Sequence, residues 1–176
     1  HQLTDSLTLL NDAKAFEHHL VKQLSQNQSF GLIMLDVDYF HQYNKIQGVE
    51  EGDRLLSQLA LWLSSALRNQ DLVCRYAGDR FVILLRGAIP PLVSVMAEQL
   101  QQGVKDFGCH ASVVWTLPSP KVLDRQANKF NAKNEAAALL QLLNQKMSQQ
   151  KENRRSASTM PTAFNGLNQS TLSELN

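Results

Sequence analysis

Two aspartates, Asp36 and Asp79, occupy the positions that point most directly to chemistry. Asp36 lies near the end of the apolar run 30–37 (FGLIMLDV), which is typical of a strand buried on both faces. Asp79 lies in a glycine-containing turn between the apolar runs 72–76 and 81–85, a pattern that predicts a hairpin. Two carboxylates a few ångströms apart stay ionised together only with a cation between them, and oxygen ligands suit Mg²⁺. The pair is therefore either a magnesium site or two ordinary turn residues.

The remaining predicted elements position these two aspartates. Apolar residues that recur at helical spacing predict helices over 13–24, 53–67, 91–102 and 135–151, and a fourth apolar run predicts a strand over 109–116. The central order is β-α-β-β-α-β, the ferredoxin-like arrangement, in which the first strand lies antiparallel beside the third. The fold class is therefore α/β of the α+β kind, a mostly antiparallel sheet flanked by helices. Its topology places the end of the first strand beside the hairpin tip, which brings Asp36 and Asp79 to one edge.

The composition indicates one cytoplasmic domain. The chain has 176 residues, of which 43% are hydrophobic, enough for a single core. A net charge of +1 argues against a nucleic-acid module, and no apolar run is long enough to span a membrane. Cys74 and Cys109 lie in apolar stretches without metal-ligand spacing, which indicates buried thiols in a reducing compartment. We expect a domain over 1–155 and a polar, poorly ordered tail or linker over 156–176.

Three segments of the chain resemble the GGDEF family, the diguanylate cyclase domains of bacterial cyclic di-GMP signalling. They are LDVDYFHQYN (35–44), GVEEGD (48–53) and RYAGDRF (75–81), and they occur in the family's order and at its spacing. The resemblance extends over about residues 3–155. It implies a palm like that of adenylate cyclases, GTP as the substrate of active members, and Mg²⁺ as the accompanying ion.

The resemblance also implies a role for individual residues. It assigns three groups to Mg²⁺ and GTP: the metal ligands Asp36, Asp79 and the Val37 backbone; the guanine-reading pair Asn44 and Asp53; and the phosphate contacts Lys151, Arg155, His41 and the Phe40 backbone. A carboxylate can accept from guanine N1 and N2 while an amide bonds the remaining edge, so the guanine pair makes chemical sense. For Lys151 and Arg155 the alternative is a solvated helix end favoured by the helix dipole.

The chain departs from the family's pattern most clearly at its signature, which reads Ala77-Gly78-Asp79-Arg80-Phe81 in place of GGDEF. Arg80 puts a cation where the family has a glutamate beside the metal. Its repulsion from Mg²⁺ at roughly 4–5 Å is of order several kcal/mol even at an effective dielectric near 20. A few kcal/mol in a barrier is about a thousandfold or more in rate, so weak or absent cyclase activity is expected. Smaller departures are Ala77 for glycine, His41 for a lysine near the phosphates, and Leu9 for a glycine in the family's opening motif.

A second motif of the family is intact in the chain. Arg68 and Asp71 form an RxxD in the register of the family's product-binding inhibitory site, just before the signature. The arginine can fork onto guanine O6 and N7, and the aspartate can accept from guanine N1 or N2. The alternative is a surface ion pair, which contributes little to stability.

Three functions remain open on these grounds. The first is a cyclic di-GMP-binding regulatory module without cyclase activity, and Arg80 favours it. The second is an active or weakly active diguanylate cyclase that condenses two GTP molecules into cyclic di-GMP, with two domains, each with one GTP, meeting as a homodimer. The third is a GTP-sensing domain. In each case we expect guanine nucleotides as ligands, a covalently linked sensory or output domain in the full protein, no nucleic-acid partner and no membrane contact by this segment.

Overall fold

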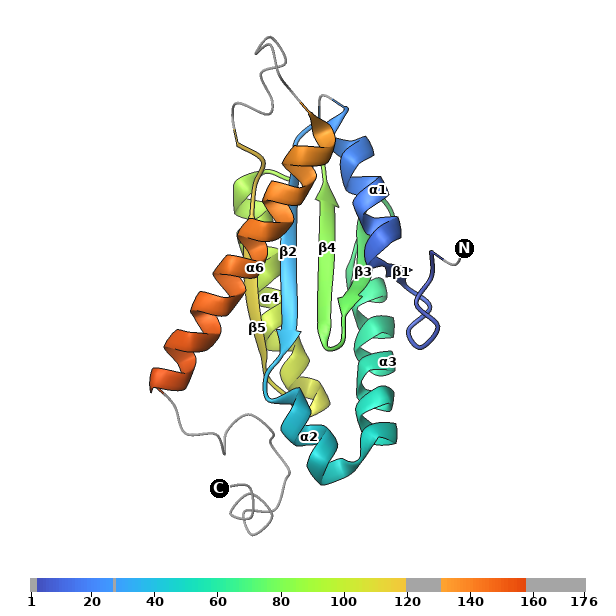
Figure 1. Ribbon diagram of the computed structural model, residues 1–176, viewed down its shortest axis with the longest axis vertical. Coiled ribbons are helices and arrows are strands. Elements are labelled where there is room, and N and C mark those ends of the chain that lie inside the picture. Colours follow the sequence, from blue (N-terminus) through green and yellow to red (C-terminus); the bar gives the residue numbers. More distant parts are fainter. Residues whose placement is uncertain (1–2, 27, 120–130, 158–176) are drawn as a thin grey trace.

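The computed structural model describes residues 3–26, 28–119 and 131–157 as a five-stranded sheet covered by helices (Figure 1). The strands are β1 (Asn11–Asp12), β2 (Phe30–Val37), β3 (Leu72–Ala77), β4 (Arg80–Arg86) and β5 (Ala111–Thr116), in the spatial order β1-β3-β4-β2-β5. The helices are α1 (Ala13–Leu24), α2 (Phe40–Gln47), α3 (Val49–Ala66), α4 (Pro90–Gly103), the 3₁₀ turn η1 (Val104–Phe107) and α6 (Ala132–Ala157). Among the strands of the described residues, only β1 and β3 pair in parallel, and the other pairs are antiparallel. The predicted fold class is confirmed.

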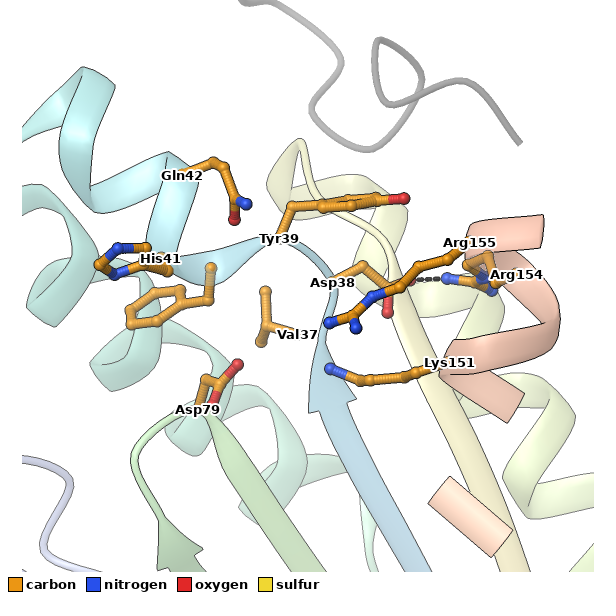
Figure 2. Close-up of a pocket in the computed structure, with 10 residues that line it drawn as sticks. Val37, Asp38, Tyr39, His41, Gln42, Asp79, Lys151, Arg154 and Arg155 are labelled. Atoms are coloured by element: carbon orange, nitrogen blue, oxygen red, sulfur yellow. Dashed lines mark ion pairs between the residues drawn. The ribbon is translucent and has the colours of Figure 1, made fainter. Parts of the chain in front are cut away.

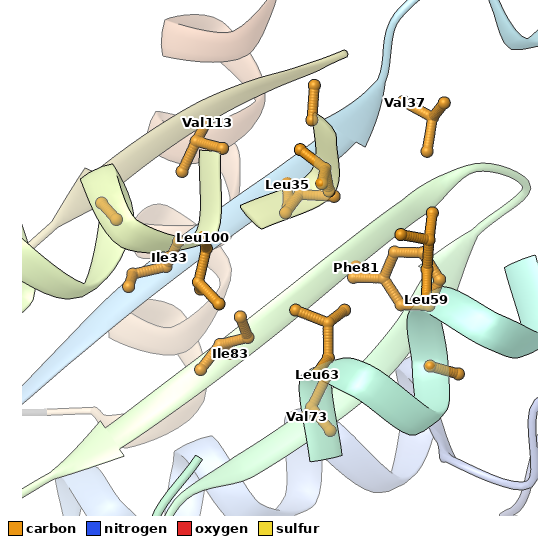
Figure 3. Packing of buried hydrophobic residues seen from close by; sticks show 14 of the residues in the cluster. Ile33, Leu35, Val37, Leu59, Leu63, Val73, Phe81, Ile83, Leu100 and Val113 are labelled. Carbon is orange, nitrogen blue, oxygen red and sulfur yellow. The ribbon is translucent and has the colours of Figure 1, made fainter. Parts of the chain in front are cut away.

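Strand β2 is buried along all eight of its residues, as its apolar run predicts. Because successive side chains point to opposite faces, β2 contributes to two cores. Ile33, Leu35 and Val37 pack with the helices α3 and α4 on one face (Figure 3). Leu32 and Met34 pack with α1 and α6 on the other face. The sheet is thus the middle layer of three, and β2 holds the two outer layers together.

The segment before α3 differs from the sequence prediction. The stretch before residue 53, for which no helix was predicted, contains α2, and α3 begins at Val49 instead of Asp53. None of the α2 residues is fully buried, so the helix carries no strong apolar stripe. Gly48 separates the two helices with a φ of 92°. Gly52 lies inside α3 because a Cβ there would overlap the Asn44 side chain of α2.

Other boundaries shift by a few residues. The strand predicted over 109–116 begins at Ala111, and the last helix covers Ala132–Ala157 instead of 135–151. The two-residue strand β1 was not predicted, because it owes its definition to pairing with β3. Most of the segment between that strand and that helix, and nearly all of the predicted tail over 156–176, lie outside the described residues.

Strand pairing brings the end of β2 to the hairpin between β3 and β4. β2 runs antiparallel beside β4, with Asp36 directly opposite Arg80. The Val37 N–H donates to the Asp79 carbonyl at 3.2 Å across the tip of the hairpin. The topology therefore places Asp36 and Asp79 at one edge of the sheet, as expected, and it also makes Arg80 the cross-strand neighbour of Asp36.

The turn that precedes α1 has an unusual backbone at Leu9. Asp5 organises this turn, since its carboxylate accepts from the Thr8 N–H at 2.8 Å and from the Thr8 hydroxyl at 2.6 Å. Leu9 follows with a φ of 61°, in the left-handed region, and its side chain is 77% exposed. A leucine in this conformation is strained by roughly 1–2 kcal/mol and gains almost no burial here in return.

We predict that Leu9→Gly stabilises the domain by about 0.5–1 kcal/mol, because relief of strain outweighs the larger backbone entropy of glycine in the unfolded chain. Leu61 in α3 is the matched control, since it is 73% exposed but lies inside a helix. Leu61→Gly should destabilise the domain by about 1 kcal/mol. Urea unfolding of both variants measures the two effects, and changes of the same sign would contradict strain at Leu9.

Candidate functional site

The carboxylate of Asp36 is buried and is neutralised by cations of the protein itself. Its side chain is only 4% exposed. The Oδ2 atom accepts from Arg80 Nη2 at 2.7 Å and Nε at 3.2 Å, and lies 3.1 Å from Lys151 Nζ. Two positive side chains, from β4 and from α6, thus converge on one oxygen. This contact balances a charge that would otherwise be costly to bury.

The Arg80 guanidinium is fixed on its other side as well. Its Nη1 donates to Asn144 Oδ1 of α6 at 2.7 Å, while its Nε and Nη2 face Asp36. The planar fork is therefore engaged by two acceptors, and the side chain is only 25% exposed. Sequence reasoning did not identify Asn144, which lies 64 positions from Arg80.

Asp79 at the hairpin tip completes this cluster. Burial and, after it, the neighbouring Asp36 carboxylate together raise its pKa to about 6, and Lys151 partly offsets the rise. The Asp36 Oδ1 atom is buried and has no hydrogen-bond donor among the described residues. A protonated Asp79 beside it can donate to an oxygen in this position. Near and below pH 6, a proton on Asp79 therefore relieves the repulsion between the two carboxylates, whereas at higher pH the charges of Arg80 and Lys151 balance it.

The residues at this edge do not fit the Mg²⁺ that the resemblance implies. The Oδ2 atom of Asp36 already faces the guanidinium and the ammonium, and a dication bound there would meet both at short range. At roughly 4–5 Å and an effective dielectric near 20, each like-charge contact costs several kcal/mol. Within the described ranges, no cluster of three or more His, Cys, Asp or Glu side chains could hold a metal. The expected ligands Asp36 and Asp79 are neighbours, but the Asp36 carboxylate is bound by cations of the chain.

A cavity of roughly 320 Å³ opens beside this cluster (Figure 2). Its walls are residues 37–42, at the end of β2 and the start of α2, together with Asp79 and three cationic side chains of α6. These are Lys151, Arg154 and Arg155. His41 and the Phe40 backbone belong to the first wall, so all the predicted phosphate contacts line one pocket.

Arg154 is a pocket residue that the sequence analysis missed. It forms an ion pair with Asp38, whose other oxygen accepts from the Ser112 hydroxyl at 2.6 Å. Asp38 is 3% exposed, so this pair ties α6 to the end of β2 inside the protein. The spacing of 151, 154 and 155 was the available signal, because residues three and four apart lie on one helix face.

The predicted guanine pair lies on two packed helices. Asn44 belongs to α2 and Asp53 to α3, which contact each other. The Asn44 Oδ1 atom is buried and has no hydrogen-bond partner in the described part of the chain. The Asp53 side chain is exposed. The Asn44 amide lies against Gly52, next to Asp53 in α3, and the role of the pair in reading guanine stays a prediction.

Arg68 and Asp71 bind each other in the structure. Arg68 Nε and Nη2 donate to the two Asp71 oxygens at 2.9 and 2.8 Å, and Nη2 also donates to the Arg86 carbonyl at 2.9 Å. This hydrogen bond to Asp71 raises the pKa of Arg68. The Asp71 side chain is fully covered, whereas that of Arg68 is 39% exposed. The pair closes the turn between α3 and β3, and the arginine keeps an accessible face.

Both cysteines are buried, as predicted, and burial raises the pKa of the Cys74 thiol to about 12 and of the Cys109 thiol to about 11. Neither is therefore a reactive thiolate at neutral pH. Among the described residues, no helix is sufficiently long and apolar to serve as a membrane span.

We predict that Arg80→Met destabilises the domain by about 1–3 kcal/mol, because Asp36 stays buried with only Lys151 to balance it. The double variant Arg80→Met/Asp36→Asn should lose at least about 1 kcal/mol less than the sum of the single variants. Denaturant unfolding provides both numbers. Arg54→Met is the control, since Arg54 pairs with Glu51 on the surface at 2.9 Å and should contribute less than about 0.5 kcal/mol. Additive single effects would show that Arg80 and Asp36 do not interact.

Known proteins resemble this chain in sequence and in fold. The family described as "Diguanylate cyclase, GGDEF domain" matches residues 2–157. The chain is 31% identical over 106 residues to the cyclic di-GMP phosphodiesterase NbdA of Pseudomonas aeruginosa, an alignment that covers 58% of this chain and 14% of that protein. It is 27% identical over 81 residues to diguanylate cyclase A of Treponema denticola, covering 46% of this chain and 22% of that protein. The chain thus spans a small part of these relatives.

The fold has close counterparts among solved structures. The crystal structure of the GGDEF domain of DgcB from Caulobacter crescentus, in complex with c-di-GMP, superimposes with a TM-score of 0.74. The superposition covers 87% of this chain and 92% of that one, at 17% sequence identity, which establishes likeness of fold. Since the family match covers nearly the whole described chain, this protein belongs to the GGDEF domain family.

Proposed function

We propose that this chain is a GGDEF domain of cyclic di-GMP signalling that makes no cyclic di-GMP and instead binds it as a regulatory module. The observation that carries the proposal is the contact of Arg80 with Asp36, at 2.7 and 3.2 Å. A cation of the chain stands where the reaction would need a metal ion. Relatives named as a cyclic di-GMP phosphodiesterase and a diguanylate cyclase support the signalling context.

The proposed site for cyclic di-GMP is the pair Arg68 and Asp71. In the unbound domain the guanidinium fork is engaged by the Asp71 carboxylate. Guanine presents O6 and N7 to an arginine and N1 and N2 donors to a carboxylate, so a bound guanine can replace each half of the pair with an equivalent partner. The exposed face of Arg68 gives the ligand access to this exchange.

A GTP-sensing domain is the second candidate, and the cationic pocket favours it. Lys151, Arg154 and Arg155 line one wall of a cavity whose opposite wall is the start of α2. Triphosphates suit such a concentration of positive charge. An active cyclase, whether a homodimer or not, is the least favoured candidate, because it requires Mg²⁺ at the position that Arg80 takes.

We further propose that the module, 1–155, acts in the cytoplasm as part of a longer protein. The segment 156–176 would then serve as a linker or tail, and a sensory or output domain would be covalently attached. The small share of its relatives' length that the chain covers supports this organisation.

We predict that the purified domain with Mg²⁺ and GTP produces cyclic di-GMP at least a thousandfold more slowly than an ordinary enzyme rate of roughly 1 s⁻¹. Chromatography of the nucleotides after overnight incubation measures the product. Arg80→Glu combined with Ala77→Gly should raise the rate, because it exchanges the blocking cation for a carboxylate and removes the added methyl. Arg80→Gln is the control that removes the cation without supplying a ligand. Rapid turnover by the unmodified domain would refute the proposal of a silent module.

We predict that cyclic di-GMP binds in the micromolar range or tighter and that Arg68→Lys weakens it by about 1–3 kcal/mol, or roughly five- to 150-fold. Lysine keeps a positive charge beside the covered Asp71 but loses the fork, so the fold is spared. Calorimetry measures the affinity, with Arg54→Lys on the exposed face of α3 as the control. GTP affinity should stay unchanged in both variants. Equal cyclic di-GMP affinity in Arg68→Lys and the unmodified domain would mean that the pair only closes a turn.

A further inference from the structure

We infer that the pocket beside Arg80 binds the phosphate chain of a guanine nucleotide without a divalent metal ion, with Arg80 acting as a fixed internal cation in place of the metal. The inference rests on the GTP-sensing candidate above and is independent of cyclic di-GMP binding at Arg68. It concerns how the charge of the nucleotide is balanced. It also gives Asn144 and Arg154 positioning roles.

The first step is that Arg80 is held in place. Asn144 Oδ1 at 2.7 Å and Asp36 Oδ2 at 2.7 and 3.2 Å engage its guanidinium from two sides. Both acceptors belong to elements of the packed core, β2 and α6, so the cation does not depend on a ligand for its position. A metal ion, by contrast, enters such a site with the nucleotide and completes its shell with phosphate oxygens.

The second step is the charge of the neighbouring wall. Lys151 lines the pocket and reaches Asp36 at 3.1 Å, so its ammonium stands between the internal cluster and the cavity. Arg155 also lines the cavity and is exposed. Arg154 is anchored by Asp38, which fixes this part of α6 against β2. The four cations here, Arg80, Lys151, Arg154 and Arg155, face the three carboxylates of Asp36, Asp38 and Asp79, so four minus three leaves a surplus of one positive charge for a ligand.

The third step concerns which form of the nucleotide fits. A free triphosphate carries more negative charge than its Mg²⁺ complex, and a pocket with a surplus of fixed cations favours the more negative form. The Arg80 and Lys151 charges also oppose entry of the dication that the complex carries. The pocket therefore selects the metal-free nucleotide, and added Mg²⁺ competes with the protein for it.

The experiment compares GTP binding to the unmodified domain in EDTA and in excess Mg²⁺ by calorimetry. We expect a dissociation constant in EDTA that is equal to or lower than that in Mg²⁺. Lys151→Met should weaken binding in EDTA about tenfold or more, since it removes a charge-assisted contact. Lys146→Met is the matched control on the same helix, because Lys146 donates to the Trp115 carbonyl at 2.8 Å, outside the pocket. Binding that requires Mg²⁺ overturns metal independence, and no binding under either condition overturns the nucleotide site as well.

A second measurement detects the metal ion directly. Electron paramagnetic resonance of Mn²⁺ should detect no ion bound by the unmodified domain, with or without GTP at the protein. Arg80→Glu should bind Mn²⁺ together with GTP, and its GTP affinity should become at least about tenfold weaker in EDTA. Mn²⁺ held by the unmodified domain at this pocket would contradict the inference. Cyclic di-GMP titrations of the same samples report separately on the Arg68 site, so a failure of one proposal is not mistaken for a failure of the other.

Discussion

The carboxylate of Asp36 lies at the end of a strand that is buried along its whole length, and its charge must be balanced inside the protein. Water cannot do so at 4% exposure, and an unpaired ionised carboxylate in such a place is strongly destabilising. The chain supplies Arg80 from the adjacent strand and Lys151 from the covering helix. Both the pairing of β2 with β4 and the packing of α6 on the sheet thus bring a cation to the buried Asp36 carboxylate.

The sheet and the main helices were predictable because their buried faces require apolar residues at the spacing of a strand or a helix. A strand covered on both faces reads as the apolar run 30–37, and helix α1 has the predicted bounds, Ala13–Leu24. Helix α2 was missed because none of its residues is fully buried. Helix α2 instead packs closely against α3. A Cβ at Gly52 of α3 would overlap the Asn44 side chain of α2. Tertiary contacts of this kind leave no periodic signal.

The sequence predicted where the residues of the candidate site lie, but not which side chains they bind. Strand order alone brought Asp36 beside the hairpin, and the charge of Arg80 alone opposed a metal ion there. The sequence could not show that the guanidinium would turn onto Asp36, because its second acceptor, Asn144, comes from a distant helix. The sequence indicated that the positive charge of Arg80 would repel a bound metal ion. The structure shows that the same charge also attracts the Asp36 carboxylate and binds it directly.

A cation that belongs to the chain and a cation that arrives with a ligand have different consequences at the same carboxylates. A metal ion exchanges with solvent, bridges protein and phosphate oxygens, and can follow charge as it develops in a reaction. A guanidinium held by Asp36 and Asn144 can attract a phosphate but cannot change its ligands. On the proposal made above, Arg80 supplies charge that attracts a nucleotide but not the Lewis acid that its chemistry needs. One residue in the signature hairpin would thereby separate recognition of the nucleotide from its chemistry.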